Sequence, residues 1–152
     1  MSVTKRTYTT RRSAIVGALV TELKKINQTG AFLTDVYDNV HPRLKFWDEV
    51  DTFPAIHVNA GSESREYQGG GYKDRFLTIT VRCYVKETDA QEALDKLLED
   101  VETVIESNGR LAYTDRQGKQ QFTLDIIVLS IDTDEGVLEP FGVAEMQLSV
   151  HY

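Results

Sequence analysis

Three histidines and one cysteine are the residues of this chain best suited to metal binding or nucleophilic chemistry. His41 precedes a proline, His57 alternates with apolar residues, and His151 lies on the polar side of an alternating segment. No two of them have the spacing of a zinc motif, and because Cys83 is the single cysteine there is no second thiolate ligand. Because Cys83 falls in an alternating apolar run, we expect it to be a small core hydrophobe. The sequence therefore predicts no metal site, no cofactor and no enzyme.

The run Asp132-Thr133-Asp134-Glu135-Gly136 has the alternating aspartates with which a calcium loop begins. An EF-hand loop needs glycine at its sixth position and glutamate at its twelfth, but here Gly136 is fifth and Val143 is twelfth. The pattern instead favours a polar turn at the end of a strand, with Gly136 supplying a positive φ.

Three successive glycines, Gly69, Gly70 and Gly71, lie in the long polar segment 61–74. Glycines let backbone amides approach a phosphate, but no Lys-Ser or Lys-Thr pair follows, and the next segment is a strand. The segment is typical of a mobile loop or a hairpin tip. Such a loop can become ordered by contact with a neighbouring subunit.

The net charge of −7 resides in one segment of the chain. Between Glu87 and Glu106 eight acidic residues stand against one basic residue, so the remainder is neutral. Three interpretations of this acidic segment remain open: a solvated face, a contact for a basic surface of another copy, or a wall that repels passing DNA. The sign of the charge disfavours duplex DNA binding. The acidic ridge consists of Glu92, Asp95, Glu99, Glu102 and Glu106, and the candidate basic surface contains Arg11 and Arg12.

Apolar periodicity predicts two amphipathic helices. The first covers 10–28, and the second opens with a capping box of Thr88 and Gln91 and runs to about Ser107. The N-cap candidates of the first helix are Thr9, Thr10 and Ser13.

Alternation between apolar and polar residues predicts the strands. The clearest strand covers 76–85, where every second residue is apolar. Residues 122–131 are apolar on both faces, which predicts a central place in the sheet. The remaining predicted strands cover 35–40, 55–58 and 143–152.

The element order α-β-β-β-α-β-β predicts an α+β fold, in which two amphipathic helices pack on one face of a mainly antiparallel sheet. A length of 152 residues fits a single domain, 1–152. No segment is typical of a signal peptide or a membrane span, so we expect a cytosol-like compartment and no membrane partner.

The segment Ile131 to Tyr152, IDTDEGVLEPFGVAEMQLSVHY, contains a Thr-x-Glu-Gly turn, a proline, a hydrophobic bridge and a final alternating strand that ends in an aromatic residue. This order resembles the ending of the tail terminator proteins of long-tailed bacteriophages. Features elsewhere agree with that family in order, from the first helix to the acidic helix. The matching motifs are Val36-Tyr37, Phe53-Pro54-Ala55-Ile56, Tyr84-Val85 and Leu111-Tyr113-Thr114.

The resemblance implies a fold similar to that of tail-tube and tail-terminator proteins. It also implies a ring, usually a homohexamer, that caps the tail tube, stops its polymerisation and provides the head-joining interface. The implied partners are the tail-tube protein and a neck or head-completion protein, with DNA passing through the ring without sequence-specific binding. The implied location is the head-proximal end of the virion tail, after assembly in the host cytoplasm. In related tube rings sheet tends to line the lumen, so we expect the acidic helix on the outside.

The polar loops 61–74, 114–121 and 132–142 are the candidates for contacts within the ring or with the tube. The candidate interface residues are Glu63, Arg65, Tyr67, Gly69, Gly70, Gly71, Tyr72, Arg116, Lys119, Asp134 and Glu135. A neck or head-completion ring is an alternative function within the same resemblance. A small ligand-binding α+β regulatory module, which would be a dimer with a concave polar pocket, is an alternative outside it.

Overall fold

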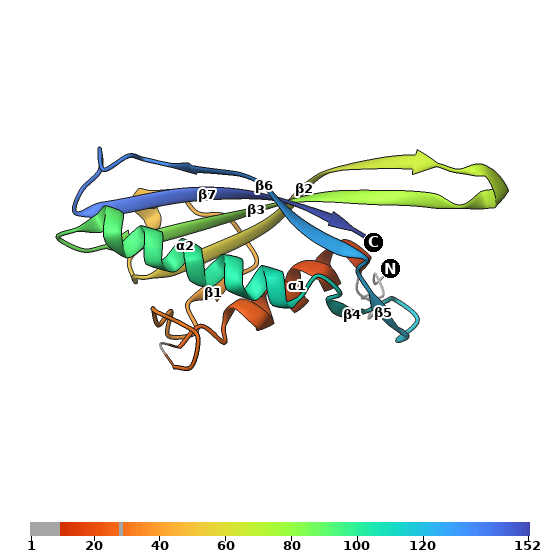
Figure 1. Cartoon of the computed structure of the whole chain (residues 1–152), viewed down its shortest axis with the longest axis horizontal. Coiled ribbons are helices and arrows are strands. Elements are labelled where there is room, and N and C mark those ends of the chain that lie inside the picture. The colour runs from red at the N-terminus through yellow and green to blue at the C-terminus, as the bar shows by residue number, and fades with distance from the viewer. Residues whose placement is uncertain (1–9, 28) are drawn as a thin grey trace, which may run out of the picture.

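The computed structural model describes residues 10–27 and 29–152. Its five-stranded sheet has the order β1-β2-β3-β7-β6, and both helices lie on the same face of this sheet (Figure 1). Every neighbouring pair is antiparallel except β1 and β2, which are parallel. The predicted α+β class is confirmed. The bounds are α1 Arg11–Leu23, β1 Val40–His41, β2 Ala55–Tyr67, β3 Lys73–Lys86, α2 Ala90–Ser107, β4 Ala112–Thr114, β5 Gln120–Phe122, β6 Asp125–Thr133 and β7 Phe141–His151.

The core lies between the sheet and the two helices. Alternate residues of β3 and β7 point into it, among them Val81, Cys83 and Met146, which are fully buried. Burial raises the pKa of the Cys83 thiol to about 12, so this cysteine is an inert hydrophobe, as its place in the alternating run predicts. Neither α1, α2 nor any other helix in the described ranges is long and apolar enough to cross a membrane.

Helix α1 is shorter than the predicted range 10–28. Thr10 is the N-cap and accepts a hydrogen bond from the Ser13 amide, whereas the other candidate Thr9 lies outside the described residues. The helix ends at Leu23 because the next amides, those of Lys25 and Ile26, bond to carbonyls three residues back and tighten the chain.

Helix α2 begins at Ala90, so the predicted capping box of Thr88 and Gln91 is wrong. Asp89 is the N-cap, and its carboxylate accepts a hydrogen bond from the Glu92 amide. A carboxylate at this position satisfies one of the free amides of the first turn and suits the positive end of the helix dipole.

Asp100 is a buried carboxylate in α2 that the sequence does not distinguish from its acidic neighbours. Its oxygens accept hydrogen bonds from the backbone amides of Leu33 and Thr34 at 2.7 to 3.1 Å and from the Thr34 hydroxyl. This carboxylate therefore fastens the segment between α1 and β1 to the second helix.

The predicted strand 35–40 is wrong except for its last residue. The Asp35 carboxylate accepts a hydrogen bond from the Tyr37 amide, and Tyr37 and Asp38 both have positive φ angles. This turn breaks the extended backbone, so β1 has only the two residues Val40 and His41.

Of the two forms predicted for the polar segment 61–74, the hairpin tip is correct and the mobile loop is wrong, because the segment is the outer half of a long β-hairpin. Strands β2 and β3 stay paired out to Tyr67 and Lys73, and a turn of three glycines, Gly69–Gly71, joins them. Gly70 and Gly71 have φ angles of 79° and 83°, which explains the need for glycine. The hairpin projects beyond the body of the molecule (Figure 1), and we call residues 62–74 the arm.

The predicted strand 122–131 is two strands, and its predicted central position is wrong. Thr123 interrupts it because its buried hydroxyl donates to the Gly109 carbonyl and accepts from the Leu111 amide. Before this break β5 pairs with β4 in a separate small sheet, so the predicted loop 114–121 is the turn and flanks of a second hairpin. After the break β6 is the last strand of the main sheet, paired only with β7.

We predict that Asp100→Ala lowers the free energy of unfolding by about 3 kcal/mol, because three donors lose a charged acceptor inside the protein. Urea denaturation measures this loss. The control Asp95→Ala removes an exposed carboxylate from the same helix and is expected to change stability by less than ~0.5 kcal/mol. Equal effects of the two substitutions would contradict the fastening role of Asp100.

His41 and His57 stack with ring centroids 5.2 Å apart. Burial is the largest cause that lowers the pKa of both, and Arg43 and Lys45 lower it further. A hydrogen bond to the Arg43 carbonyl offsets part of the effect on His57. Both rings are therefore held neutral in the folded protein below the pH at which free histidine takes up a proton.

This histidine pair predicts a pH dependence of stability. Above the ordinary histidine pKa of 6.5 the folded and unfolded states are both neutral at these rings. As the pH falls below it, the unfolded chain binds protons first, so the free energy of unfolding falls between about pH 6.5 and pH 5. The double variant His41→Gln, His57→Gln is expected to flatten this slope in a pH series of urea melts. An unchanged slope in the variant would show that other groups cause the pH dependence of the free energy of unfolding.

Candidate assembly surfaces

Strand β6 is an apolar strand at the open edge of the main sheet. Ile126 faces the core, but the following apolar side chains are exposed on both faces of the strand. Ile127 is 48% exposed and Leu129 is 55% exposed, and no described strand pairs with the outer edge. An uncovered apolar edge strand is a template for pairing with another chain. The exposed apolar residues of this edge are Leu124, Ile127, Val128, Leu129 and Ile131.

The arm ends in exposed aromatic residues. Tyr67 and Tyr72 are each about three-quarters exposed, and the Lys73 ammonium lies 5.6 Å from the centre of the Tyr67 ring. Aromatic rings with a nearby cation are common at protein interfaces. The tip of the arm is therefore a second candidate contact.

The base of the arm is fastened to the body by a polar cluster. The Glu63 carboxylate accepts hydrogen bonds from the Tyr152 hydroxyl and from Arg65, the latter at 2.7 Å. Desolvation raises the pKa of Glu63, but these two hydrogen bonds outweigh it, so the pKa lies below its ordinary value. Desolvation, and next the neighbouring Glu63, raise the pKa of Tyr152 to about 12. Arg12 adds a hydrogen bond to the Gly61 carbonyl.

The two other predicted loops are organised by their own carboxylates. Asp115 accepts hydrogen bonds from the Gln117 and Lys119 amides and from the Gln121 side chain. Asp134 accepts from the amides of Leu138 and Val143. Asp134 thus has an internal role in its turn. Arg116, Lys119 and Glu135 are exposed on these turns.

The turn 132–142 has the conformation predicted for it. Glu135 and Gly136 have positive φ angles, and a Cβ on Gly136 would lie 3.2 Å from the Gln91 side chain. The polar-turn interpretation is confirmed for Gly136. Among the described residues no group of three or more histidine, cysteine or acidic side chains could hold a metal ion.

The acidic ridge lies along α2, with Glu92, Asp95, Glu99 and Glu106 exposed and Glu102 half-buried. Lys96 approaches Glu92 at 3.4 Å. Arg11 and Arg12 are exposed at the start of α1, and among the described residues no ion pair joins them to the ridge. The structure therefore brings together Glu63, Arg65 and Arg12 at the base of the arm, and the predicted residues 67–72 at its tip. The other predicted residues lie on separate surfaces.

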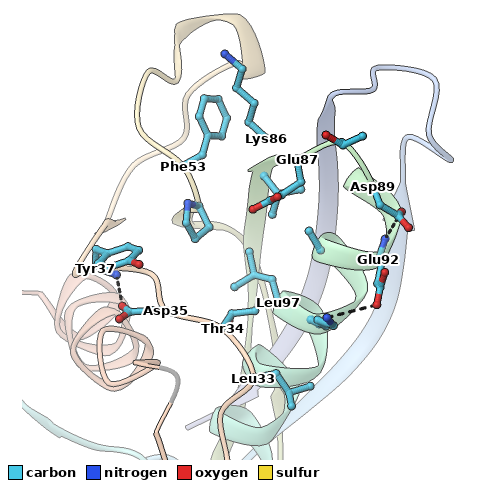
Figure 2. A pocket seen from close by; sticks show the side chains of 15 residues that line it. Leu33, Thr34, Asp35, Tyr37, Phe53, Lys86, Glu87, Asp89, Glu92 and Leu97 are labelled. Atoms are coloured by element: carbon cyan, nitrogen blue, oxygen red, sulfur yellow. Dashed lines mark hydrogen bonds and ion pairs between the residues drawn. The ribbon is translucent and has the colours of Figure 1, made fainter.

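A groove of about 410 Å³, which the sequence did not predict, lies where α2 begins beside β3 and the turn at Tyr37 (Figure 2). Four of its charged groups serve local structure: Asp89 caps the helix, Asp35 holds the Tyr37 turn, and Glu92 pairs with Lys96. The labelled side chains in Figure 2 include no nucleophile paired with a base.

The open face of the sheet carries polar side chains that contact one another across strands. Arg82 contacts Glu145 at 3.0 Å, and His151 contacts Asp74 at 3.0 Å. Thr80 donates a hydrogen bond to Gln147. A polar open face, an apolar open edge and a projecting arm are thus the three surfaces that this chain offers for contacts with other proteins.

Comparison with known proteins identifies the class. A family described as the bacteriophage tail tube terminator protein matches residues 9–152, and the chain belongs to this family. It is 35% identical over 149 residues to the tail tube terminator protein p142 of Escherichia phage T5, covering 93% of this chain and 92% of that protein. The resemblance seen in the sequence is confirmed, and the chain is a structural protein of the virion tail that terminates the tail tube.

The fold also occurs in a solved virion. A chain from the native gene transfer agent (GTA) particle superposes with a TM-score of 0.56, covering 91% of this chain and 96% of that one at 10% identity. This likeness concerns the fold. The residues that sequence reasoning missed as a contact surface are those of β6, and their signal was the run that is apolar on both faces.

The internal pairing of the arm base gives a test. Because Glu63 joins Tyr152 to Arg65, Glu63→Ala is expected to loosen the arm and to cost about 1 to 2 kcal/mol of unfolding free energy. Limited proteolysis is expected to cut the arm faster in this variant. Glu66→Ala, at an exposed position of the same arm, is the matched control, and equal cutting of both variants would contradict the role of Glu63.

Proposed function

We propose that this chain forms a closed ring, a homohexamer as the family resemblance implies, that caps the head-proximal end of the tail tube. The observation that supports the ring is the uncovered apolar edge of β6. A strand with exposed apolar residues on both faces is stabilised when another chain covers it, and head-to-tail contacts related by rotation cover every such edge.

Termination requires that the two ends of the ring differ, because a subunit that bound its own kind at both ends would continue the stack. The arm projects beyond the sheet at one end of the molecule (Figure 1). We assign the arm, with Tyr67 and Tyr72 at its tip, to contact with the tail-tube protein. The opposite end, where α2 begins, then faces a neck or head-completion protein.

The open face of the sheet suits a channel for DNA. Its charges are paired, as for Arg82 with Glu145, so it has few free cations to hold phosphates. In this arrangement DNA passes without sequence-specific binding, and the acidic ridge of α2 lies outside. The chain acts as one domain, without catalysis, cofactor or membrane partner, and assembles in the host cytoplasm.

A neck or head-completion ring is the second candidate, because the same open edge would close such a ring. The two functions differ in what the ring binds. Purified chain is mixed with tail tubes and imaged by negative stain, with light scattering after size exclusion for the chain alone. The proposal predicts rings on one end of each tube. A ring that leaves tubes bare and binds filled heads would favour the neck function, and a dimer that binds a small ligand would favour the regulatory module.

The edge itself is tested by the double variant Ile127→Asp, Leu129→Asp. Charges at these positions cannot be buried against another chain, so assembly is expected to be lost while the circular dichroism spectrum stays that of the wild type. Val137→Asp is the matched control, because Val137 is 83% exposed but lies outside the strand, in the turn that joins β6 to β7. Normal ring formation by the double variant would contradict the proposed role of the β6 edge in assembly.

The arm is tested by replacing Glu66 to Asp74 with Asn-Gly. Arg65 and Arg75 are cross-strand partners, so a two-residue turn joins them without strain on the register. The shortened protein is expected to form rings but to lose tube binding in a co-sedimentation assay. Tube binding at the wild-type level would show that the arm does not contact the tube.

A further inference from the structure

A shallow recess lies on the opposite edge of the sheet from β6. It has a volume of about 300 Å³ and lies between α1 and the part of β2 that β1 does not cover. Strand β1 pairs only with Ile56 and His57, so the edge of β2 is open from Asn59 onward in the described structure. The residues that line the recess include Arg12, Ser13 and Val16 of α1, Asn59 and Ala60 of β2, and Pro42.

The recess and the exposed Val128 side chain of β6 lie on the same face of the sheet. Val128 is opposite Leu148, which is fully buried beneath the helices, so Val128 points to the helix side. Ala60 also points to that side, where it packs against the core. Val128 is 36% exposed.

The recess and Val128 also lie at the same level along the direction of the strands. Ala60 is opposite Ile79, Ile79 is opposite Leu148, and Leu148 is opposite Val128. These four residues form one row across the sheet. A closed ring repeats by rotation without translation, so where the strands run along the ring axis, Val128 of one copy meets Ala60 of the next.

The two edges are complementary in direction and in charge. Strand β6 is antiparallel to β7, β7 to β3, and β3 to β2, so β6 is antiparallel to β2 of a second copy in the same orientation. Strand β6 carries Asp125 and Asp132 and no basic residue. The other edge carries Arg12 in the recess, and Arg43 and Lys45 follow β1.

We infer that the recess beside α1 is the acceptor site for β6 of a second copy of this chain, with the Val128 side chain seated against Ala60 and Val16. This inference rests on the proposed ring and names the surfaces that close it. In this arrangement the exposed Val128 side chain of one copy fills the recess of the next copy. Both apolar surfaces are thereby removed from water. Asp132 of β6, which lies in the row of Glu145, Arg82 and His57, then faces the part of the edge beside Arg43, whose carbonyl contacts the His57 ring.

Disulfide trapping tests this pairing in full-length protein. The variant Val128→Cys, Ala60→Cys is expected to give a ladder of covalent oligomers under mild oxidation, because the two Cα atoms come within disulfide reach. The matched control is Ile127→Cys, Ala60→Cys, since Ile127 is more exposed but points to the other face. Light scattering and imaging with tail tubes report ring formation in the same samples.

Each outcome has one meaning. A ladder from the Val128 pair and little from the control supports the inference. Rings without a ladder, or equal ladders from both pairs, overturn the inference and leave the ring in place. No ring in solution or on tubes overturns the proposed function itself.

A size exchange gives an independent readout. Ala60→Phe fills the recess and is expected to weaken ring assembly about tenfold. Adding Val128→Ala makes room and is expected to restore part of the loss, whereas Val128→Ala alone weakens assembly. Assembly of Ala60→Phe at the wild-type concentration would overturn the inference, provided that its circular dichroism spectrum matches the wild type.

Discussion

The constraint on which this structure depends is the open edge of β6. A strand needs partners for its backbone amides and carbonyls, and apolar side chains gain stability only when they leave water. Strand β6 has a partner on one side and exposed Ile127 and Leu129 on its faces. One copy of the chain therefore satisfies only half of what this strand requires, and the proposed ring would supply the other half.

The remainder of the fold keeps that edge rigid and the two ends different. Helices α1 and α2 cover one face of the sheet, and Asp100 fastens the segment at Leu33 and Thr34 to α2. At one end the arm is held by Glu63 and Tyr152 and carries exposed tyrosines beyond the sheet. Because the two ends carry different elements, the proposed ring would bind the tube on one side only.

The sequence predicts those parts of the fold that follow from local periodicity. The alternation in β3 and β7 and the apolar side of α2 correspond to buried residues. The sequence-based prediction fails where tertiary contacts decide the structure. Asp100 cannot be distinguished from the acidic residues of the ridge until its hydrogen-bond donors are placed. The arm 62–74 resembles a loop because both its faces are polar. The interpretation of β6 as a central strand is wrong for one chain, but the same pattern is what a strand buried between copies requires. The arm tip and polar turns were identified as candidates, whereas the recess beside α1 joins residues distant in sequence and has no local signal.

The central claim is that β6 becomes an inner strand on assembly. Hydrogen–deuterium exchange of residues 125–133, compared between free chain and chain bound to tail tubes, measures this directly, because amides on the outer edge exchange freely until another strand accepts their hydrogen bonds. We predict that exchange in β6 slows strongly on the tube, while the buried strand β3 changes little. Tube ends capped by chain in which β6 exchanges as fast as in the free protein would contradict this claim.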